Sequence, residues 1–424
     1  MVIRHKHLRC ALAASAGAAL SMAHPLGIAA AIAMPALTLE QETRRDSYAA
    51  GLSYYGAALW PLIPAAKNFF GLEVSAVAAV ALWVIGSILL ALPWMLVWSS
   101  DRRQALWRAP LGLALTVVPP LGIIGWASPL TAAGILFPGT AWLGLVLCAV
   151  AGGGLAARPH LAAVVLAAVS AICNVVFSRD SKSLPEWRAV NTAFGGIAHG
   201  SASPVATYAA AEWIQREALT STAKVLVFPE TVVPTWTPAT DAFWQQTLDR
   251  LRSSGKTILV GALVPAPLHS AVSPRYDFSA DLAALTGTPP QSVPVINSKA
   301  ERKAAPAFAY ENTLILRGAE TGSFKQRIPV PIAMWNPLKT AAARLNISGT
   351  GVIHLHGERA AVLICYEQLL IWPVLASMVE RPTVLIAIAN DHWATGTPIP
   401  RFQLAAVCAW ARLFHLPYLS AVNL

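Results

Sequence analysis

Apolar residues fill the first 177 positions in long runs that only short polar stretches interrupt. No charged residue lies between Glu73 and Asp101 or between Arg108 and Arg158. Uncharged apolar runs of about 20 residues are typical of helices that cross a lipid bilayer, whereas a surface helix of a soluble protein shows a polar face. We therefore predict about seven apolar helices. They are expected near 8–22, 25–39, 48–65, 73–99, 105–125, 132–153 and 160–177.

The N-terminal end of this apolar half is open to three interpretations. The segments at 8–22 and 25–39 are each short for a full span of about 20 residues. They form either one helical hairpin broken at His24–Pro25 or a single long span. A signal peptide is the third interpretation, because three cations precede an Ala-rich stretch. The apolar segments that follow at once favour the first two.

The pattern changes at Arg179, where charges return and short β-rich runs alternate with helical stretches. Residues 1–177 hold 15 of the Asp, Glu, Lys and Arg side chains, and residues 178–424 hold 37. Alternating strands and helices predict an α/β domain. We expect a multi-helix transmembrane domain at 1–178, then the α/β domain at 179–424 with a surface insertion near 266–306. Strands are expected at 223–228, 257–263, 312–316, 360–365, 383–389 and 418–422, and helices at 239–254, 366–380 and 401–415.

Composition and charge placement agree with a membrane protein. Hydrophobic residues make up 55% of the chain and charged residues 12%, about half the usual charged share. The net charge is +10, but the cations are scattered and form no basic stripe, so no nucleic-acid partner is expected. With the N-terminus in the cytoplasm, only Lys67 falls in an outside loop, an asymmetry typical of inner-membrane proteins. Seven crossings of such a multi-pass protein then place residue 178 onward outside, which is the periplasm if the membrane is the bacterial inner (plasma) membrane of a Gram-negative cell. The cations of the inside loops are Arg4, Lys6, Arg9, Arg44, Arg45, Arg102, Arg103, Arg108 and Arg158.

The cysteines predict neither a disulfide framework nor a metal site. Their number is odd, their spacing is wide, and no CxxC pair occurs. Those in apolar segments act as small hydrophobic residues. We expect no metal and no cofactor. The five are Cys10, Cys148, Cys173, Cys365 and Cys408.

Three residues with catalytic chemistry stand beside the predicted strands. Glu230 follows the strand at 223–228 in Phe-Pro-Glu-Thr, where burial would raise its pKa and suit it as a general base. Lys325 precedes a Pro-bracketed segment and could face a developing oxyanion. Cys365 ends an apolar strand and begins a helix, a position that favours a nucleophile. Taken one at a time, each also fits a structural role: a surface Glu, a solvated basic turn and a buried Cys.

The order of these residues resembles the carbon–nitrogen hydrolase (nitrilase) superfamily. The resemblance rests on FPET around Glu230, FKQRIPVP from Phe324 and ICYE around Cys365, followed by a strand-end Asn-Asp-His-Trp and the helix at 403–412. It implies an α/β nitrilase-like domain (an αββα sandwich half) with Glu230 as base, Lys325 as oxyanion donor and Cys365 as nucleophile. The residues that it implies in supporting roles are Tyr366, Glu367, Asn390, Asp391 and Trp393.

A nitrilase-like domain that follows transmembrane helices resembles apolipoprotein N-acyltransferase. The run Gly51–Trp60 looks like that family's early aromatic–glycine helix, and within the group the chain looks closest to the plasmid conjugal-transfer TraB proteins. The resemblance implies that a Cys365 thioester carries an acyl group from a phospholipid donor to a lipoprotein-like amine acceptor. Both substrates lie in the membrane.

Two departures from the acyltransferase pattern leave other functions open. Ala333 stands where the family has a second Glu, and Glu367 is a candidate substitute. Family members also continue with further strands and a final transmembrane helix after the position of Leu424. A catalytically impaired membrane scaffold that assists conjugation and a periplasmic-facing amidase are therefore the alternatives. A transporter is disfavoured, because the apolar spans carry no charge.

Overall fold

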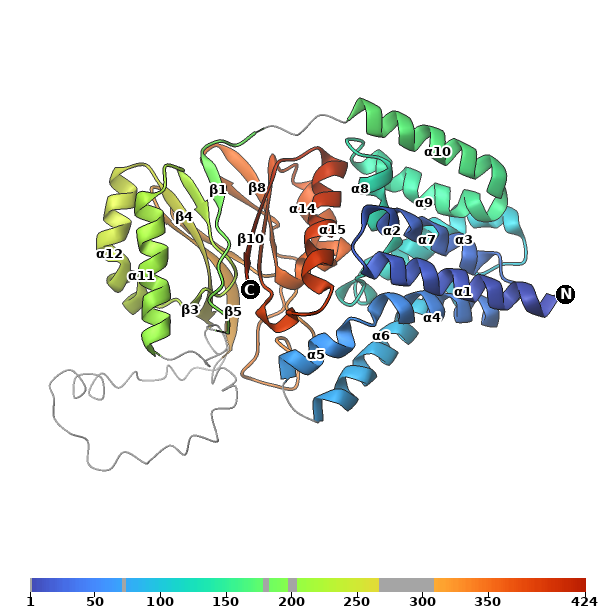
Figure 1. The fold of residues 1–424 in the computed structure, drawn as a ribbon, viewed down its shortest axis with the longest axis horizontal. Helices are drawn as coiled ribbons and strands as arrows, with labels where there is room; N and C mark the ends of the chain where they lie inside the picture. Colours follow the sequence, from blue (N-terminus) through green and yellow to red (C-terminus); the bar gives the residue numbers. More distant parts are fainter. Residues whose placement is uncertain (1, 71–73, 178–182, 197–203, 267–308) are drawn as a thin grey trace.

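The computed structural model describes residues 2–70, 74–177, 183–196, 204–266 and 309–424, which form a helical part and an α/β part lying side by side (Figure 1). The insertion expected near 266–306 lies outside the described residues except for Ala266, and so does the expected boundary at Arg179.

The N-terminal part is built from helices that follow the apolar segments. Some begin at recognisable signals: Thr43 Oγ1 accepts a hydrogen bond from the Asp46 N–H at the start of α4, and Pro159 opens α10. The helices are α1 (Val2–Ser21), α2 (Pro25–Ala30), α3 (Met34–Leu39), α4 (Arg44–Leu59), α5 (Leu62–Phe70), α6 (Val74–Val97), α7 (Ala105–Val117), α8 (Ala133–Leu136), α9 (Trp142–Ala157) and α10 (Pro159–Val176), with 3-10 turns η1 (Ala31–Ala33), η2 (Arg102–Gln104), η3 (Leu121–Ile123) and η4 (Pro129–Ala132).

The prediction of about seven membrane spans is not confirmed. Among the described residues, two helical segments are long and apolar enough to cross a bilayer, Ala76–Val97 and Pro159–Val176. Two further apolar helical segments, Pro25–Leu39 and Trp142–Ala157, are shorter. The seven apolar segments are therefore divided into more and shorter helices, because turns such as the one at His24 and the 3-10 turns interrupt them.

Two sheets form the centre of the α/β part. In the first, the strand order is β1-β2-β4-β5-β6, and β3 also pairs with β4. In the second, the order is β10-β9-β8-β7. Strands β1, β2 and β4 run parallel, as do β10, β9 and β8. The strands are β1 (Trp187–Ala189), β2 (Val225–Val227), β3 (Val233–Thr235), β4 (Thr257–Pro265), β5 (Tyr310–Gly318), β6 (Gly322–Lys325), β7 (Val352–Leu355), β8 (Glu358–Ile364), β9 (Val384–Asn390) and β10 (Tyr418–Asn423).

Helices cover the outer face of each sheet and give four layers, α-β-β-α (Figure 1). Side chains along β2 point alternately to the two faces of the sheet: Val225 and Val227 pack between the sheets, whereas Leu226 packs under the outer helices. Parallel strands buried on both faces read as continuous apolar runs, which is why β2, β8 and β9 were predictable. The first sheet is covered by α11 (Pro204–Thr220) and α12 (Pro238–Ser253), and the second by α14 (Ile371–Val379) and α15 (Ile399–Phe414).

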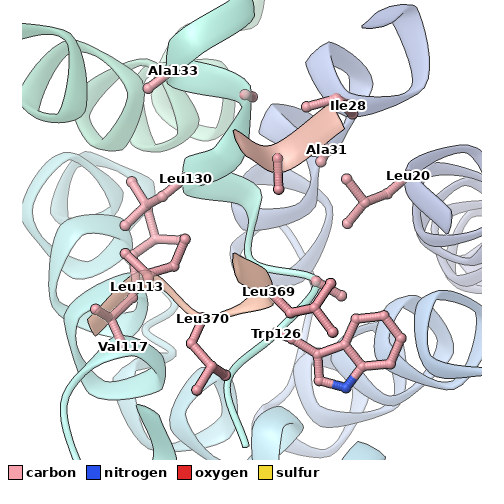
Figure 2. Close-up of a cluster of buried hydrophobic side chains, with 14 of the residues drawn as sticks. Leu20, Ile28, Ala31, Leu113, Val117, Trp126, Leu130, Ala133, Leu369 and Leu370 are labelled. Carbon is pink, nitrogen blue, oxygen red and sulfur yellow. The ribbon is translucent and has the colours of Figure 1, made fainter. Parts of the chain in front are cut away.

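The helical part packs directly on α14, α15 and the turn after β8. Leu369 and Leu370 lie in one apolar cluster with Leu113, Trp126 and other side chains of the helical part (Figure 2). The N–H groups of Gly139 and Ala141 donate to the carbonyls of Arg412 and Leu413 at the end of α15 (both 2.8 Å). A continuous apolar core and backbone hydrogen bonds therefore join the two parts.

Candidate active site

Glu230 is presented by a tight turn at the carboxyl end of β2. The turn is locked to β4, since the Phe228 N–H donates to Leu259 O (2.8 Å) and the Gly261 N–H donates to Pro229 O (3.1 Å). Thr231 has a positive φ of 48°. A Cβ at Gly261 would lie 2.5 Å from the Glu230 Cα, so only glycine allows this approach. The carboxylate is thus held by backbone geometry.

Three donors converge on the buried Glu230 carboxylate. Asn312 Nδ2 donates to Oε1 (2.5 Å), the Asn390 N–H donates to Oε2 (2.8 Å), and the Cys365 thiol also bonds to it. Burial raises the pKa of the Glu230 carboxyl, and the hydrogen bonds from Asn390, Asn312 and Cys365 offset part of that rise. A carboxylate with a raised pKa that already holds the thiol is suited to accept the thiol proton.

Cys365 stands on a strained turn between β8 and the 3-10 helix η6 (Cys365–Leu369). Its φ is 50°, a region that non-glycine residues rarely adopt and that is often found at functional sites. Gln403 Nε2 on α15 donates to the Cys365 carbonyl (3.0 Å) and stabilises this conformation. Burial, followed by the charges of Glu230 and Asp391, raises the pKa of the thiol well above its usual range. The resting group is a thiol, so attack by its sulfur requires a base.

Lys325 does not join this pair, which corrects its predicted role as oxyanion donor. Its Nζ forms an ion pair with Glu311 (2.7 Å), and its side chain is 51% exposed. The reason is the period of two along β6: Phe324 faces the space between the sheets, so the next side chain faces outward. A shift of one residue places a side chain on the wrong face of a strand.

Gln326 occupies the inward position that sequence reasoning gave to the lysine. It is buried, its Oε1 accepts from Asn312 Nδ2 (2.9 Å), and its Nε2 donates to Ile364 O beside Cys365 (2.9 Å). A neutral amide therefore stands next to the nucleophile. Because Phe324 faces inward, alternation along the strand predicts that Gln326 also faces inward, and this signal would have identified it. Asn312 could have been identified as a polar residue at the start of an apolar strand.

The Lys325→Gln variant is expected to keep acylation of Cys365 within about twofold of the unchanged protein, because the exposed ammonium bonds to Glu311 and lies outside the site. The rate of p-nitrophenolate release from an activated ester measures it. A loss of a hundredfold or more would instead return Lys325 to the site.

Glu367 and Arg327 form a buried ion pair beneath the site. Glu367 Oε1 accepts from the Arg327 N–H (2.7 Å), Arg327 Nε (3.2 Å) and the Ile328 N–H (3.2 Å), and Oε2 accepts from the Ile364 N–H (3.0 Å). These bonds tie the segment after β6 to the turn that carries Cys365. Glu367 is therefore engaged in structure, and the predicted substitution for the missing carboxylate at Ala333 does not fit its contacts.

The other predicted residues surround the pair at different distances. Asn390 anchors Glu230 through its N–H, and Asp391 follows it at the end of β9, buried beside Glu230. Tyr366 is turned away, since its hydroxyl donates to Ile123 O in the helical part (2.9 Å). Trp393 packs edge-on against Phe69 of α5 with ring centroids 5.8 Å apart. The last two connect the site to the helical part.

In the described ranges, no group of three or more His, Cys, Asp or Glu side chains is placed to hold a metal ion.

Two curated proteins are similar to the chain over nearly its whole length. One is described as a probable conjugal transfer protein TraB from Sinorhizobium fredii, 28% identical over 400 residues, which covers 93% of this chain and 92% of the relative. The other is a conjugal transfer protein TraB from Agrobacterium fabrum, 29% identical over 416 residues, which covers 93% and 87%. The resemblance to the TraB proteins is confirmed. No family model matches the chain.

Among solved structures, the chain is similar to amidases of the nitrilase superfamily over about half its length. One amidase from Nesterenkonia is 13% identical with a TM-score of 0.28, covering 48% of this chain and 64% of that one. Another structure of the same enzyme, with the acetamide moiety of fluoroacetamide added at its active-site cysteine, is 14% identical with a TM-score of 0.32, covering 55% and 75%. TM-scores this low carry no functional conclusion, so the chemistry of the site rests on its own geometry.

Proposed function

We propose that this chain is a membrane-embedded, acyltransferase-like protein of conjugal transfer that uses Cys365 as an acyl-carrying nucleophile. One observation carries the proposal: the buried Cys365 thiol, on a strained turn, bonds to a buried carboxylate that two other donors, Asn312 Nδ2 and the Asn390 N–H, hold in place. This is the arrangement that nucleophilic catalysis requires of a thiol and its base.

In the proposed reaction, Glu230 accepts the thiol proton as Cys365 Sγ attacks the ester carbonyl of a phospholipid. The S–C bond forms and the carbonyl π electrons move to oxygen. Collapse of this oxyanion expels the lysophospholipid alkoxide, which takes the proton from Glu230. An amine acceptor then attacks the thioester carbonyl, the C–N bond forms and the S–C bond breaks, and the proton lost by the amine passes to the departing thiolate, which leaves an amide and the restored thiol.

The surface of the helical part supports a membrane setting for this reaction. Large apolar side chains are exposed along α6 and α10, among them Val77, Ile85, Val164 and Val175. Exposed apolar side chains repeated along a helix are typical of contact with lipid or a partner. In the proposed arrangement the helical part lies in the inner membrane, the α/β part faces the periplasm, and the names of the relatives supply the conjugal context.

The test is capture of the acyl group on Cys365. The full chain in phospholipid vesicles that contain an alkyne-tagged acyl chain is expected to become labelled, and neutral hydroxylamine, which cleaves thioesters, is expected to remove the label. The Cys365→Ala variant should lose the label completely, because no other group replaces the attacking sulfur. Cys408→Ala, at a half-buried cysteine on α15, is the matched control that should keep it. Undiminished labelling of Cys365→Ala contradicts the proposal.

A scaffold without catalysis is the second candidate, and the neutral Gln326 at the position expected for a lysine favours it. If the chain is a scaffold, we expect the Cys365→Ala variant to support conjugal mating at the unchanged frequency and the natural sequence never to be labelled. Release of ammonia from small amides would point instead to an amidase.

A further inference from the structure

Asp391 carries a buried carboxyl group that the geometry so far leaves without a role. Its backbone is fixed, since its N–H donates to Asn423 O (2.8 Å) and its carbonyl accepts from the Ala394 N–H (2.8 Å). The residue is 1% exposed, and its Oδ1 is buried without a hydrogen-bond partner in the described part of the chain. A buried carboxyl without partners is costly and is a frequent mark of a functional site.

Topology places this carboxyl beside the nucleophile. Strands β8 and β9 are parallel neighbours with Ile364 paired to Ile388, so Cys365 and Asp391 both leave the carboxyl edge of the same sheet. Asp391 acts electrostatically on the Cys365 thiol, and Glu230 acts electrostatically on Asp391. The three groups therefore form one buried cluster.

Two carboxyls in such a cluster share one proton at neutral pH, because two adjacent buried charges repel. Glu230 receives hydrogen bonds from Asn312, Asn390 and Cys365, which favour its ionised form. Burial and then the charge of Glu230 raise the pKa of Asp391 to about 7. Below about pH 7 Asp391 is therefore protonated, while the hydrogen-bond donors around Glu230 favour the charge on that carboxylate.

No cation among the described residues of the cluster is free to meet an oxyanion. Lys325 points to solvent, and Arg327 is bound to Glu367. Gln326 can offer an N–H, but its Nε2 already donates to Ile364 O. Stabilisation of an oxyanion here requires neutral donors.

We propose that Asp391, in its protonated form, donates a hydrogen bond to the oxyanion that forms when Cys365 is acylated, and so replaces the absent lysine. This inference rests on the proposed function. The thiol proton moves to Glu230, the Sγ–C bond forms, and the carbonyl electron pair moves to oxygen. The Asp391 O–H then bonds to that oxygen and keeps its proton when the leaving group departs.

The proposal sets the sign of the pH dependence. Glu230 must be ionised to act as base, so acylation rises as the pH increases through its raised pKa. Asp391 must be protonated, so acylation falls as the pH increases through about 7. Glu230 and the Cys365 thiol are the titratable groups that act on it. The expected profile is a narrow bell.

The experiment uses the full chain in detergent micelles with p-nitrophenyl butyrate, whose acylation of Cys365 releases p-nitrophenolate and is verified by the mass of the adduct. Asp391→Ala is expected to acylate about 10²- to 10³-fold more slowly, as for loss of one oxyanion donor. Asp391→Asn keeps an N–H donor of similar shape, so it should stay within about tenfold and lose the fall above pH 7. Asp249→Asn, at an exposed carboxylate of α12, is the control expected to match the unchanged protein.

Alkylation of Cys365 by iodoacetamide separates this role from folding, because alkylation creates no oxyanion. Both Asp391 variants should alkylate at least as fast as the unchanged protein, since Asp391 no longer raises the thiol pKa. An Asp391→Ala variant that acylates normally, or equal losses in both Asp391 variants, overturns the inference while Cys365 acylation stands. Absence of any acyl adduct on Cys365 in the unchanged protein overturns the proposed function together with it.

Discussion

Glu230→Gln is expected to slow acylation of Cys365 by about 10²- to 10⁴-fold, the usual contribution of a general base. The thiol that Glu230 holds has a pKa well above its usual range, so very little thiolate exists at neutral pH without the base. Glutamine keeps the shape of the side chain and can accept one hydrogen bond from Asn312 or Asn390, but it cannot take the proton. The decisive measurement is the rate of p-nitrophenolate release from p-nitrophenyl butyrate, recorded over a pH range of about 5 to 9.

The pH profile distinguishes a lost base from a damaged site. In Glu230→Gln the remaining rate should rise with pH up to about 7, because the thiolate must then form by direct ionisation, and level off where Asp391 loses its proton. Glu212→Gln on α11, in the outer helical layer of the α/β part, serves as the control and should follow the unchanged protein. If Glu230→Gln acylates at the unchanged rate, another group accepts the thiol proton and the Glu230–Cys365 pair is only structural.

The long buried strands were predictable because their apolar runs have few alternatives. All six expected strands exist, and β8 spans Glu358–Ile364 where 360–365 was expected. Strands β1, β3, β6 and β7 were missed, since runs of three or four residues with mixed polarity give no periodic signal. Helix α11 was also missed, and its sequence Pro204–Thr220 mixes apolar and polar residues along its whole length. Short elements of this kind are fixed by tertiary packing.

The site residues also differ in how far the sequence predicts them: the position of a residue at the end of a strand is predictable, whereas the face to which its side chain points depends on strand pairing. Glu230 and Cys365 were predictable, because residues at the carboxyl ends of buried strands gather at one edge. The sequence did not show that the side chain of Lys325 faces outward and that of Gln326 inward, a distinction that depends on how β6 pairs with β5. Asn312 was missed, because its contact with Glu230 joins segments far apart in the chain, which no local pattern contains. Asp391 was expected from the strand-end motif, but its position beside Glu230 also depends on such a long-range contact.

Arg327→Met is expected to lower the free energy of unfolding by about 3–5 kcal/mol, the usual result of removing one partner of a buried ion pair. Arg327 is 1% exposed and Glu367 is fully buried. Besides Glu367, the guanidinium donates to Ser377 Oγ (3.0 Å) and Val362 O (3.3 Å), so its loss leaves a buried carboxylate and two acceptors uncompensated. Since Glu367 also holds the Ile364 N–H, the turn that carries Cys365 should loosen with it.

Urea unfolding followed by tryptophan fluorescence measures the change, with Arg252→Met as the matched control. Arg252 pairs with Asp249 on the surface of α12 at 2.7 Å, and both side chains are more than half exposed, so the control should cost about 1 kcal/mol or less. The double variant Arg327→Met/Glu367→Leu removes both charges and should recover part of the loss, because an apolar pair of similar size can replace a buried ion pair. Equal losses at Arg327 and Arg252 would show that Glu367 finds another partner. The turn at Cys365 would then not depend on the pair.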